Sequence, residues 1–227
     1  MPIIDSLLSL IAPHECIGCD AEGSLLCAPC IDGLAAPVRQ CYKCHIPAER
    51  FATCPDCRRE SGLISVLPAV KYTGLAKDIV WKIKFGRTRS ASHEIAAVIV
   101  QKLSLCQQVA GKQKIIFTHA PTATTRVRQR GYDQAALIAR NVARLSHAPY
   151  IPLLARAGQQ KQIGASRSQR TAQLRSAFRP LRSDRIKGAH IILIDDVVTT
   201  GATLEAAAHV LMDAGARRVD AIVFAQA

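Results

Sequence analysis

Aromatic residues are scarce in this chain: they make up 4% of its 227 residues and include a single Trp. So few rings exclude a broad base-stacking surface of the kind that oligonucleotide-binding barrels carry. Long uncharged apolar runs are also missing, because the opening stretch "MPIIDSLLSLIAP" is well short of the about twenty residues that a membrane-spanning helix needs. That stretch lacks the basic leader and the small-residue cleavage site of a signal peptide. We therefore expect no membrane span, no targeting segment and a cytoplasmic location.

Acidic residues are few relative to basic ones. The chain has 17 Asp and Glu against 30 Lys and Arg, which gives a formal net charge of +13 at pH 7. An excess of this size favours an anionic partner, such as nucleic acid, a polyphosphate metabolite or both. The alternative is a soluble protein that is merely basic.

Cysteine is almost confined to one part of the chain, since Cys106 alone lies beyond Cys57. The other eight form four Cys-x-x-Cys pairs, "CIGC", "CAPC", "CYKC" and "CPDC", and two such pairs complete a tetrahedral thiolate site for zinc. The short gaps between pairs favour sequential pairing, although a crossed arrangement also fits the sequence. The expected ligands are Cys16, Cys19, Cys27 and Cys30 for one ion and Cys41, Cys44, Cys54 and Cys57 for the other.

A disulfide framework and a redox dithiol are the alternatives for these cysteines. The lack of a signal peptide argues against disulfides, and four pairs are more than one redox centre uses. The segment also has few large apolar residues, so bound metal would have to supply its folding energy. We therefore expect two closed structural zinc sites.

Beyond about residue 60 the pattern changes to alternating strands and helices. Strand-like runs such as "SVLPAVKYT", "KQKIIFTHAPT" and "AHIILIDD" alternate with helix-periodic runs such as "DQAALIARNVARL" and "TLEAAAHVLMDAG". This alternation predicts an α/β fold, with a mostly parallel sheet flanked by helices. We expect two domains, a small cysteine-rich zinc-binding domain over residues 1–60 and the α/β domain over residues 61–227.

The stretch "IILIDDVVTTGAT" joins a buried strand to a small, hydroxyl-rich loop. The loop residues Thr199, Thr200, Gly201, Ala202 and Thr203 precede a helix, so backbone N–H groups, hydroxyls and the helix N-terminus can surround a phosphate. The adjacent carboxylates of Asp195 and Asp196 can accept hydrogen bonds from the two neighbouring hydroxyls of a ribose. A ribose 5-phosphate fits this order of groups. No Gly-Lys-Ser/Thr follows, so triphosphate hydrolysis is not indicated.

These features together resemble a known family. "IILIDDVVTTGAT" looks like the thirteen-residue signature of type I phosphoribosyltransferases, which bind phosphoribosyl pyrophosphate. The whole chain is similar to the ComF family, the competence proteins implicated in natural transformation. That similarity is carried by "PHECIGCDAEG", "LCAPC", "VWKIKFGR", "APTATTRVRQRGYDQA" and "SRSQRTAQLRSAF". It implies a type I phosphoribosyltransferase fold with an N-terminal double zinc ribbon.

The resemblance also implies a second ligand loop, which would contact the pyrophosphate. Here that loop would consist of Ala120, Pro121 and Thr122, and Arg126 and Arg130 follow it closely enough to neutralise the pyrophosphate. A solvated basic face is the alternative for these arginines. The nearby His119 is at least as easily explained as a structural residue as a general acid or base, so no catalytic residue is assigned.

Two further basic groups follow from the same resemblance. Arg167 and Arg170 lie in the segment that takes the place of a mobile flap over the site. Lys84 and Arg87 would either complete an anionic pocket or follow a nucleic-acid backbone.

The expected function is binding of phosphoribosyl pyrophosphate in DNA uptake during natural transformation, with single-stranded DNA on the basic surface. Mg²⁺ would be held chiefly by pyrophosphate and ribose oxygens. One alternative is an active phosphoribosyltransferase that uses an unknown nitrogen acceptor in nucleotide metabolism. Purine-salvage enzymes carry an Asp at the position of Thr199, so purine salvage is disfavoured. The other alternative is a zinc-ribbon adaptor that binds a competence helicase or DNA translocase.

Overall fold

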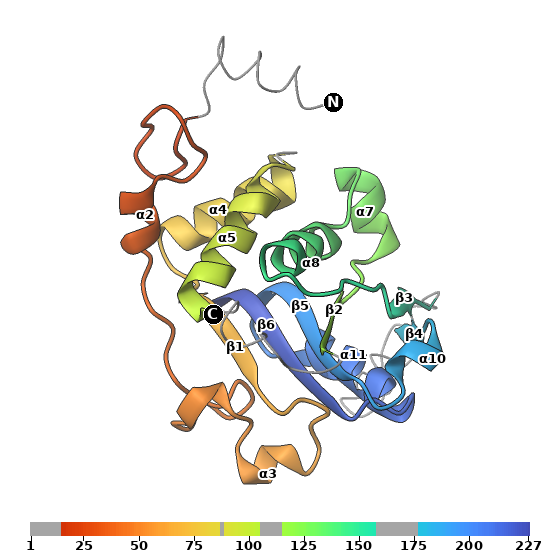
Figure 1. Cartoon of the computed structure of the whole chain (residues 1–227). Helices are drawn as coiled ribbons and strands as arrows, with labels where there is room; N and C mark the ends of the chain where they lie inside the picture. The colour runs from red at the N-terminus through yellow and green to blue at the C-terminus, as the bar shows by residue number, and fades with distance from the viewer. Residues whose placement is uncertain (1–14, 87–88, 105–114, 158–176) are drawn as a thin grey trace, which may run out of the picture.

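The computed structural model describes residues 15–86, 89–104, 115–157 and 177–227. Its central element is a parallel sheet of four strands in the order β1-β6-β5-β2 (Figure 1). The strands are β1 (Val66–Lys71), β6 (Arg218–Gln226), β5 (His190–Val198) and β2 (Ile115–His119). Parallel strands in one sheet require crossover connections, which the helices between them supply. The expected α/β class is therefore confirmed.

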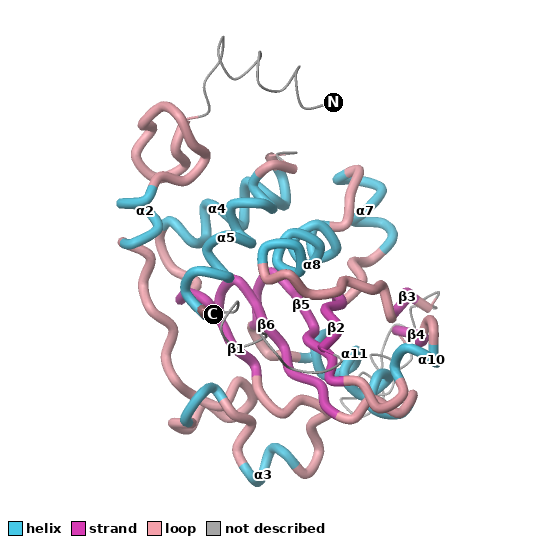
Figure 2. Tube along the Cα trace, viewed as in Figure 1, coloured by secondary structure: helices cyan, strands magenta, loops and turns pink. Residues whose placement is uncertain are grey.

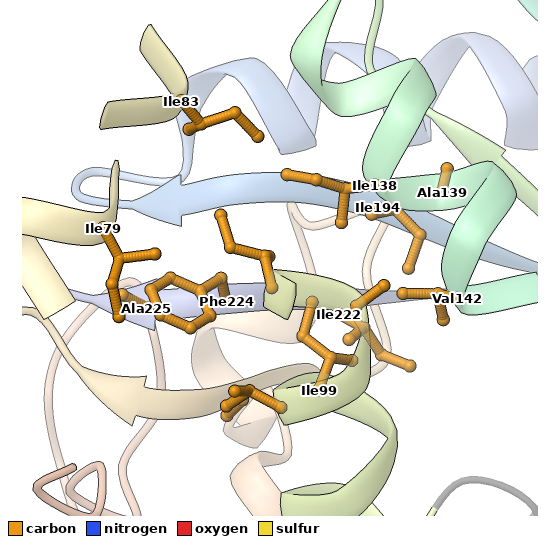
Figure 3. Packing of buried hydrophobic residues seen from close by; sticks show 14 of the residues in the cluster. Ile79, Ile83, Ile99, Ile138, Ala139, Val142, Ile194, Ile222, Phe224 and Ala225 are labelled. Carbon is orange, nitrogen blue, oxygen red and sulfur yellow. The ribbon is translucent and has the colours of Figure 1, made fainter. Parts of the chain in front are cut away.

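Helices cover both faces of this sheet, so its strands are apolar on both sides. On one face lie α4 (Leu75–Phe85), α5 (Ala91–Leu103) and α8 (Gln134–Leu145), and Figure 3 shows their isoleucines and valines packed on Ile194, Ile222 and Phe224. On the other face α11 (Ala202–Asp213) packs on Ile191, Leu193 and Val223. Successive residues of β5 thus belong to opposite cores, as the period of a strand requires.

The smaller elements differ most from the sequence-based expectation. The arginine-rich stretch after the second ligand loop forms a helix, α7 (Thr124–Arg130), that ends at Gly131 with φ of +81°. The stretch "PYIPLLAR" contributes only the short strand β3 (Leu154–Arg156), which pairs antiparallel with β4 (Phe178–Pro180) outside the main sheet. A further one-turn helix, α10 (Ser183–Ile186), precedes β5.

The cysteine-rich segment is mostly loop, with short helical turns at α2 (Ala28–Asp32), η1 (Glu49–Phe51) and α3 (Pro55–Arg58) (Figure 2). Its two halves lie at opposite ends of the molecule, one beside α4 and the other below β1 (Figure 1). Each half contributes to a different core: Leu26 belongs to the core under α4 and α5, and Tyr42 to the core under α11. The domain boundary at residue 60 stays a prediction.

All described helices have 13 residues or fewer. None of them combines the length and the apolar character that crossing a bilayer demands.

Candidate functional site

A cavity of about 690 Å³ opens at the carboxyl ends of β2 and β5. Binding sites of parallel sheets lie at this edge, because the loops that follow neighbouring strands meet there. The cavity brings together residues that are far apart in the sequence and that the sequence analysis had singled out. They are Lys84, Ala120–Thr122, Arg126, Arg130, Asp195 and Asp196, together with Thr199 and Thr203.

Two adjacent carboxylates form the floor of this cavity. Asp196 is buried; its Oδ2 forms an ion pair with Lys84 Nζ at 3.1 Å and accepts a hydrogen bond from Gln134 Nε2 at 3.3 Å. The backbone N–H of Asp196 donates to Asp195 Oδ1 at 2.9 Å. Burial and the charge of Asp196 raise the pKa of Asp195 to about 8. Asp195 therefore retains its proton to a higher pH than an exposed aspartate does.

The loop after β5 curls around a second, small cavity of about 50 Å³. Its residues Thr199–Thr203 line this cavity together with Asp195. Gly201 adopts φ of +73° at the N-cap of α11, a conformation that glycine tolerates best. The positive end of a 12-residue helix and the threonine hydroxyls therefore face a space of anion size.

Tyr42, from the segment that contains the second group of four cysteines, packs against this loop. A Cβ atom on Gly201 would lie 2.5 Å from Cε2 of Tyr42, which stands between Cys41 and Cys44. The hydroxyl of Tyr42 donates to Glu205 in the first turns of α11. Glu205 Oε2 also accepts from the backbone N–H of Gly62 at 3.2 Å. One tyrosine thus joins the cysteine-rich segment to the loop, a contact that sequence reasoning missed.

The loop of Ala120, Pro121 and Thr122 forms the opposite wall of the main cavity. Its backbone joins β5 through the N–H of Ala120, which donates to the carbonyl of Ile194 at 3.2 Å. Asp133, the N-cap of α8, accepts from both the backbone N–H and the hydroxyl of Thr122, at 2.8 and 2.9 Å. A single carboxylate therefore fixes the loop and begins the next helix.

His119, at the end of β2, has a structural environment. Its Nδ1 lies 2.9 Å from the hydroxyl of Tyr150, and the imidazole is buried. Burial lowers its pKa, with Asp133 opposing and Arg140 adding to the shift. Burial thus favours the neutral form of the imidazole.

Three arginines give the cavity its positive charge. Arg126 and Arg130 reach it from α7, as the sequence suggested. Arg156, at the end of β3, reaches it from a segment that the sequence analysis had not connected with the site. Arg156 Nε donates to the carbonyl of Pro121 at 3.0 Å, so the guanidinium is held against the loop.

Three residues that the sequence analysis named are not described by the structure, and two that it did not name line the cavity. Arg87, Arg167 and Arg170 lie outside the described residues. Sequence reasoning missed Gln134 and Tyr132, although both stand in the quoted stretch "RQRGYDQA". The sequence signal that could have identified them is their position directly after the arginine-rich segment.

The eight cysteines form two groups of four, each with its sulfur atoms within 4.8 Å of one another. The grouping is sequential, so the crossed alternative is wrong. The Sγ atoms of Cys16 and Cys27 are 3.6 Å apart, and those of Cys44 and Cys54 are 3.5 Å apart. Tetrahedral Zn–S bonds of about 2.3 Å would separate the sulfurs by about 3.8 Å. The donor set and spacing fit structural zinc.

The thiols in each group differ in acidity. Burial opposes ionisation of Cys16 and Cys41, but backbone N–H groups of the knuckles outweigh it and lower the pKa values to about 6 and about 7. The neighbouring thiol Cys27 and burial raise the pKa of Cys30 to about 12. Burial and the neighbouring thiol Cys54 raise the pKa of Cys57 to about 12. Neighbouring thiolates within a group repel one another, and a bound divalent metal would offset that repulsion.

Comparisons with known proteins agree with this geometry. Residues 135–227 match the phosphoribosyl transferase domain family. The chain is 31% identical over 182 residues to competence protein ComFC of Bacillus subtilis (strain 168), covering 77% of this chain and 72% of that protein. It is 26% identical over 203 residues to DNA utilization protein YhgH of Salmonella typhimurium (strain LT2), covering 86% and 87% of the two chains.

A solved structure is also similar in part. Glutamine phosphoribosylpyrophosphate amidotransferase from B. subtilis, in complex with ADP and GMP, aligns with a TM-score of 0.43 and 17% identity. The alignment covers 64% of this chain and 30% of that one.

The parallel sheet, the strand-end cavity and the domain match define a protein with a type I phosphoribosyltransferase fold. Two four-cysteine groups at the N-terminal side are added to that fold. The chain belongs to the ComF family.

Proposed function

We propose that this protein binds phosphoribosyl pyrophosphate in the strand-end cavity and acts in DNA uptake. The observation that carries the proposal is the meeting of the carboxylate pair and the threonine loop in one cavity with three arginines. A carboxylate pair would repel a simple polyanion. A ligand with a diol between two anionic groups explains why the cavity contains both a carboxylate pair and arginines.

The arrangement supports one orientation of the ligand. The 5′-phosphate would occupy the small cavity of Thr199–Thr203, at the positive end of α11. The ribose hydroxyls would donate to Asp195 and Asp196. The pyrophosphate would lie along Ala120–Thr122, where Arg126, Arg130 and Arg156 offer compensating charge.

Two kinds of metal ion accompany this proposal. Zinc in the two cysteine groups would hold the N-terminal segment in place. Mg²⁺ would enter with the ligand and supply charge neutralisation for the pyrophosphate. The residues of this chain would then contribute positioning, through Asp133 on the Thr122 loop and Gln134 on Asp196.

The biological role rests on the relatives. Their names place one in competence and the other in DNA utilization, and this chain covers more than two thirds of each. The net charge of +13 supports direct contact with single-stranded DNA. The described arginines around the cavity support a DNA contact next to the ligand site.

Calorimetry with three ligands tests the proposed binding. Wild-type protein in Mg²⁺ is titrated with phosphoribosyl pyrophosphate, with ribose 5-phosphate and with pyrophosphate. The intact ligand is expected to bind at least tenfold more tightly than either fragment, because it engages the threonine loop and the arginines at once. Equal affinity for pyrophosphate alone would leave the carboxylate pair and the loop without a role and would refute the proposal.

Release of free pyrophosphate in the presence of candidate nitrogen bases separates binding from transfer. In transfer, the base nitrogen forms a bond to C1 of the ribose and pyrophosphate leaves with the bonding electron pair. Turnover with a base would establish the phosphoribosyltransferase alternative.

A further inference from the structure

Helix α4 exposes two aromatic rings one turn apart. Trp81 and Phe85 are 58% and 62% exposed, and their ring centroids are 5.9 Å apart. The inward face of the same helix is already filled by Ile79, Val80 and Ile83. Burying a ring of this size is favourable by about 2 kcal/mol or more, so nothing in the described part of the chain explains two exposed rings side by side.

The rings adjoin the proposed ligand cavity. Phe85 is one of the residues that line it, and Lys84, its neighbour in the sequence, pairs with Asp196 on its floor. Arg130, also on the cavity wall, places its guanidinium carbon 5.4 Å from the centroid of Phe85. One nitrogen of that guanidinium, Nη1, has no hydrogen-bond partner among the described residues.

Basic side chains outnumber acidic ones on and next to α4. Lys77 and Lys82 are exposed on α4, and Arg89, just beyond the helix, lies 5.4 Å from the ring centroid of Tyr132. Asp78 is the single acidic residue of the helix. Exposed rings on a lysine-rich helix, with the Arg130 guanidinium beside Phe85, match the planar bases and anionic backbone of a single nucleic-acid strand.

We propose that Trp81 and Phe85 form a stacking site for the bases of single-stranded DNA at the mouth of the phosphoribosyl pyrophosphate cavity. Two rings are a small surface compared with the roughly 800 Å² per partner of a stable protein interface, whereas base stacking needs only the ring faces. The proposal rests on the DNA contact in the proposed function and gives that contact a location. Few aromatic residues are sufficient here because the helix gathers two of them at one place.

Trp81 is the only tryptophan of the chain, so its emission reports on this site alone. Wild-type protein is titrated with a short oligothymidylate and the fluorescence is recorded. We expect quenching that saturates with binding. Replacing Trp81→Leu or Phe85→Leu should weaken binding, measured by anisotropy of a labelled oligonucleotide, about fivefold to a hundredfold, since each stacked base contributes roughly 1–3 kcal/mol. The salt dependence should stay the same.

Controls separate this inference from the proposed function. Ile46→Ser removes an exposed apolar side chain of the cysteine-rich segment and should leave DNA affinity unchanged. Trp81 does not line the cavity, so Trp81→Leu should bind phosphoribosyl pyrophosphate as the wild type does. Wild-type DNA binding without quenching, or with Trp81→Leu unaffected, would overturn the stacking site even if the pyrophosphate ligand binds. Loss of self-association in Trp81→Leu, with unchanged DNA affinity, would likewise overturn it and assign the rings to a second copy.

Discussion

The ammonium nitrogen of Lys84 lies 3.1 Å from Oδ2 of Asp196, and both side chains are largely buried. Lys84 comes from α4 and Asp196 from β5, so the pair joins a covering helix to the floor of the cavity. The lysine partly balances the two carboxylates and adds positive charge where an anionic ligand would arrive. This contact favours the pocket hypothesis for Lys84 over contact with a nucleic-acid backbone.

Lys84→Met should weaken binding of phosphoribosyl pyrophosphate with Mg²⁺ about tenfold or more. The substitution keeps the length of the side chain but removes a buried charge that offsets the carboxylates. Lys84→Arg, which keeps the charge, should lose less. Calorimetry of both variants checks this, and an affinity of Lys84→Met equal to that of the wild type would exclude Lys84 from the site.

Asp195 should make the protein less stable as the pH rises. Its pKa is about 8 in the folded chain, far above the ordinary value of 3.8, so the folded state binds the proton more tightly than the unfolded state. Stability from this group is therefore full below the ordinary pKa and is lost as pH rises toward 8. Asp195→Asn cannot ionise, and its melting temperature should exceed that of the wild type by an amount that grows between about pH 5.5 and pH 8.5. A difference that is constant with pH would contradict the raised pKa.

Gly201→Ala should weaken binding of the proposed ligand at least tenfold in the wild-type background. The new methyl group would lie 2.5 Å from the ring of Tyr42 and would also have to tolerate φ of +73°. In a Tyr42→Ala background the clash is absent and only the backbone strain, about 1 kcal/mol, remains. A smaller loss there, measured by calorimetry on all four proteins, would demonstrate the contact; equal losses would show that the ring does not support the loop.

Metal analysis should return two zinc ions per chain. Cys19→Ser and Cys44→Ser each remove one exposed ligand, from different groups, and each should lower the content by one ion. The Cys44 group holds Tyr42 against the threonine loop, so Cys44→Ser should also weaken the proposed ligand binding, whereas Cys19→Ser should not. Less than one zinc per wild-type chain, or simultaneous loss of both ions in either variant, would contradict two independent sites.

The parts of the fold and site that the sequence predicts are those encoded by neighbouring residues. The strand, the carboxylate pair and the threonine loop follow one another within Ile191–Thr203, and each cysteine knuckle is complete within a few residues. Their chemistry is legible because spacing alone places the groups together.

The remaining site residues depend on tertiary contacts that no local pattern encodes. Arg156 reaches Pro121 from a strand outside the main sheet, and Tyr42 reaches Gly201 across about 160 positions of the chain. Asp133 has a local role as a helix cap, which conceals its second role on Thr122. The outward ring of Trp81 was missed because periodicity points to the inward face of a helix.

The central claim, a ribose held by the carboxylate pair, is tested most directly by calorimetry with phosphoribosyl pyrophosphate and Mg²⁺ on the wild type and on Asp195→Ala/Asp196→Ala. Asp213→Ala, which removes an exposed carboxylate at the end of α11, is the matched control. The account predicts at least a hundredfold loss in the double variant, about 3 kcal/mol, and no change in the control. Equal affinity in the wild type and the double variant would contradict it.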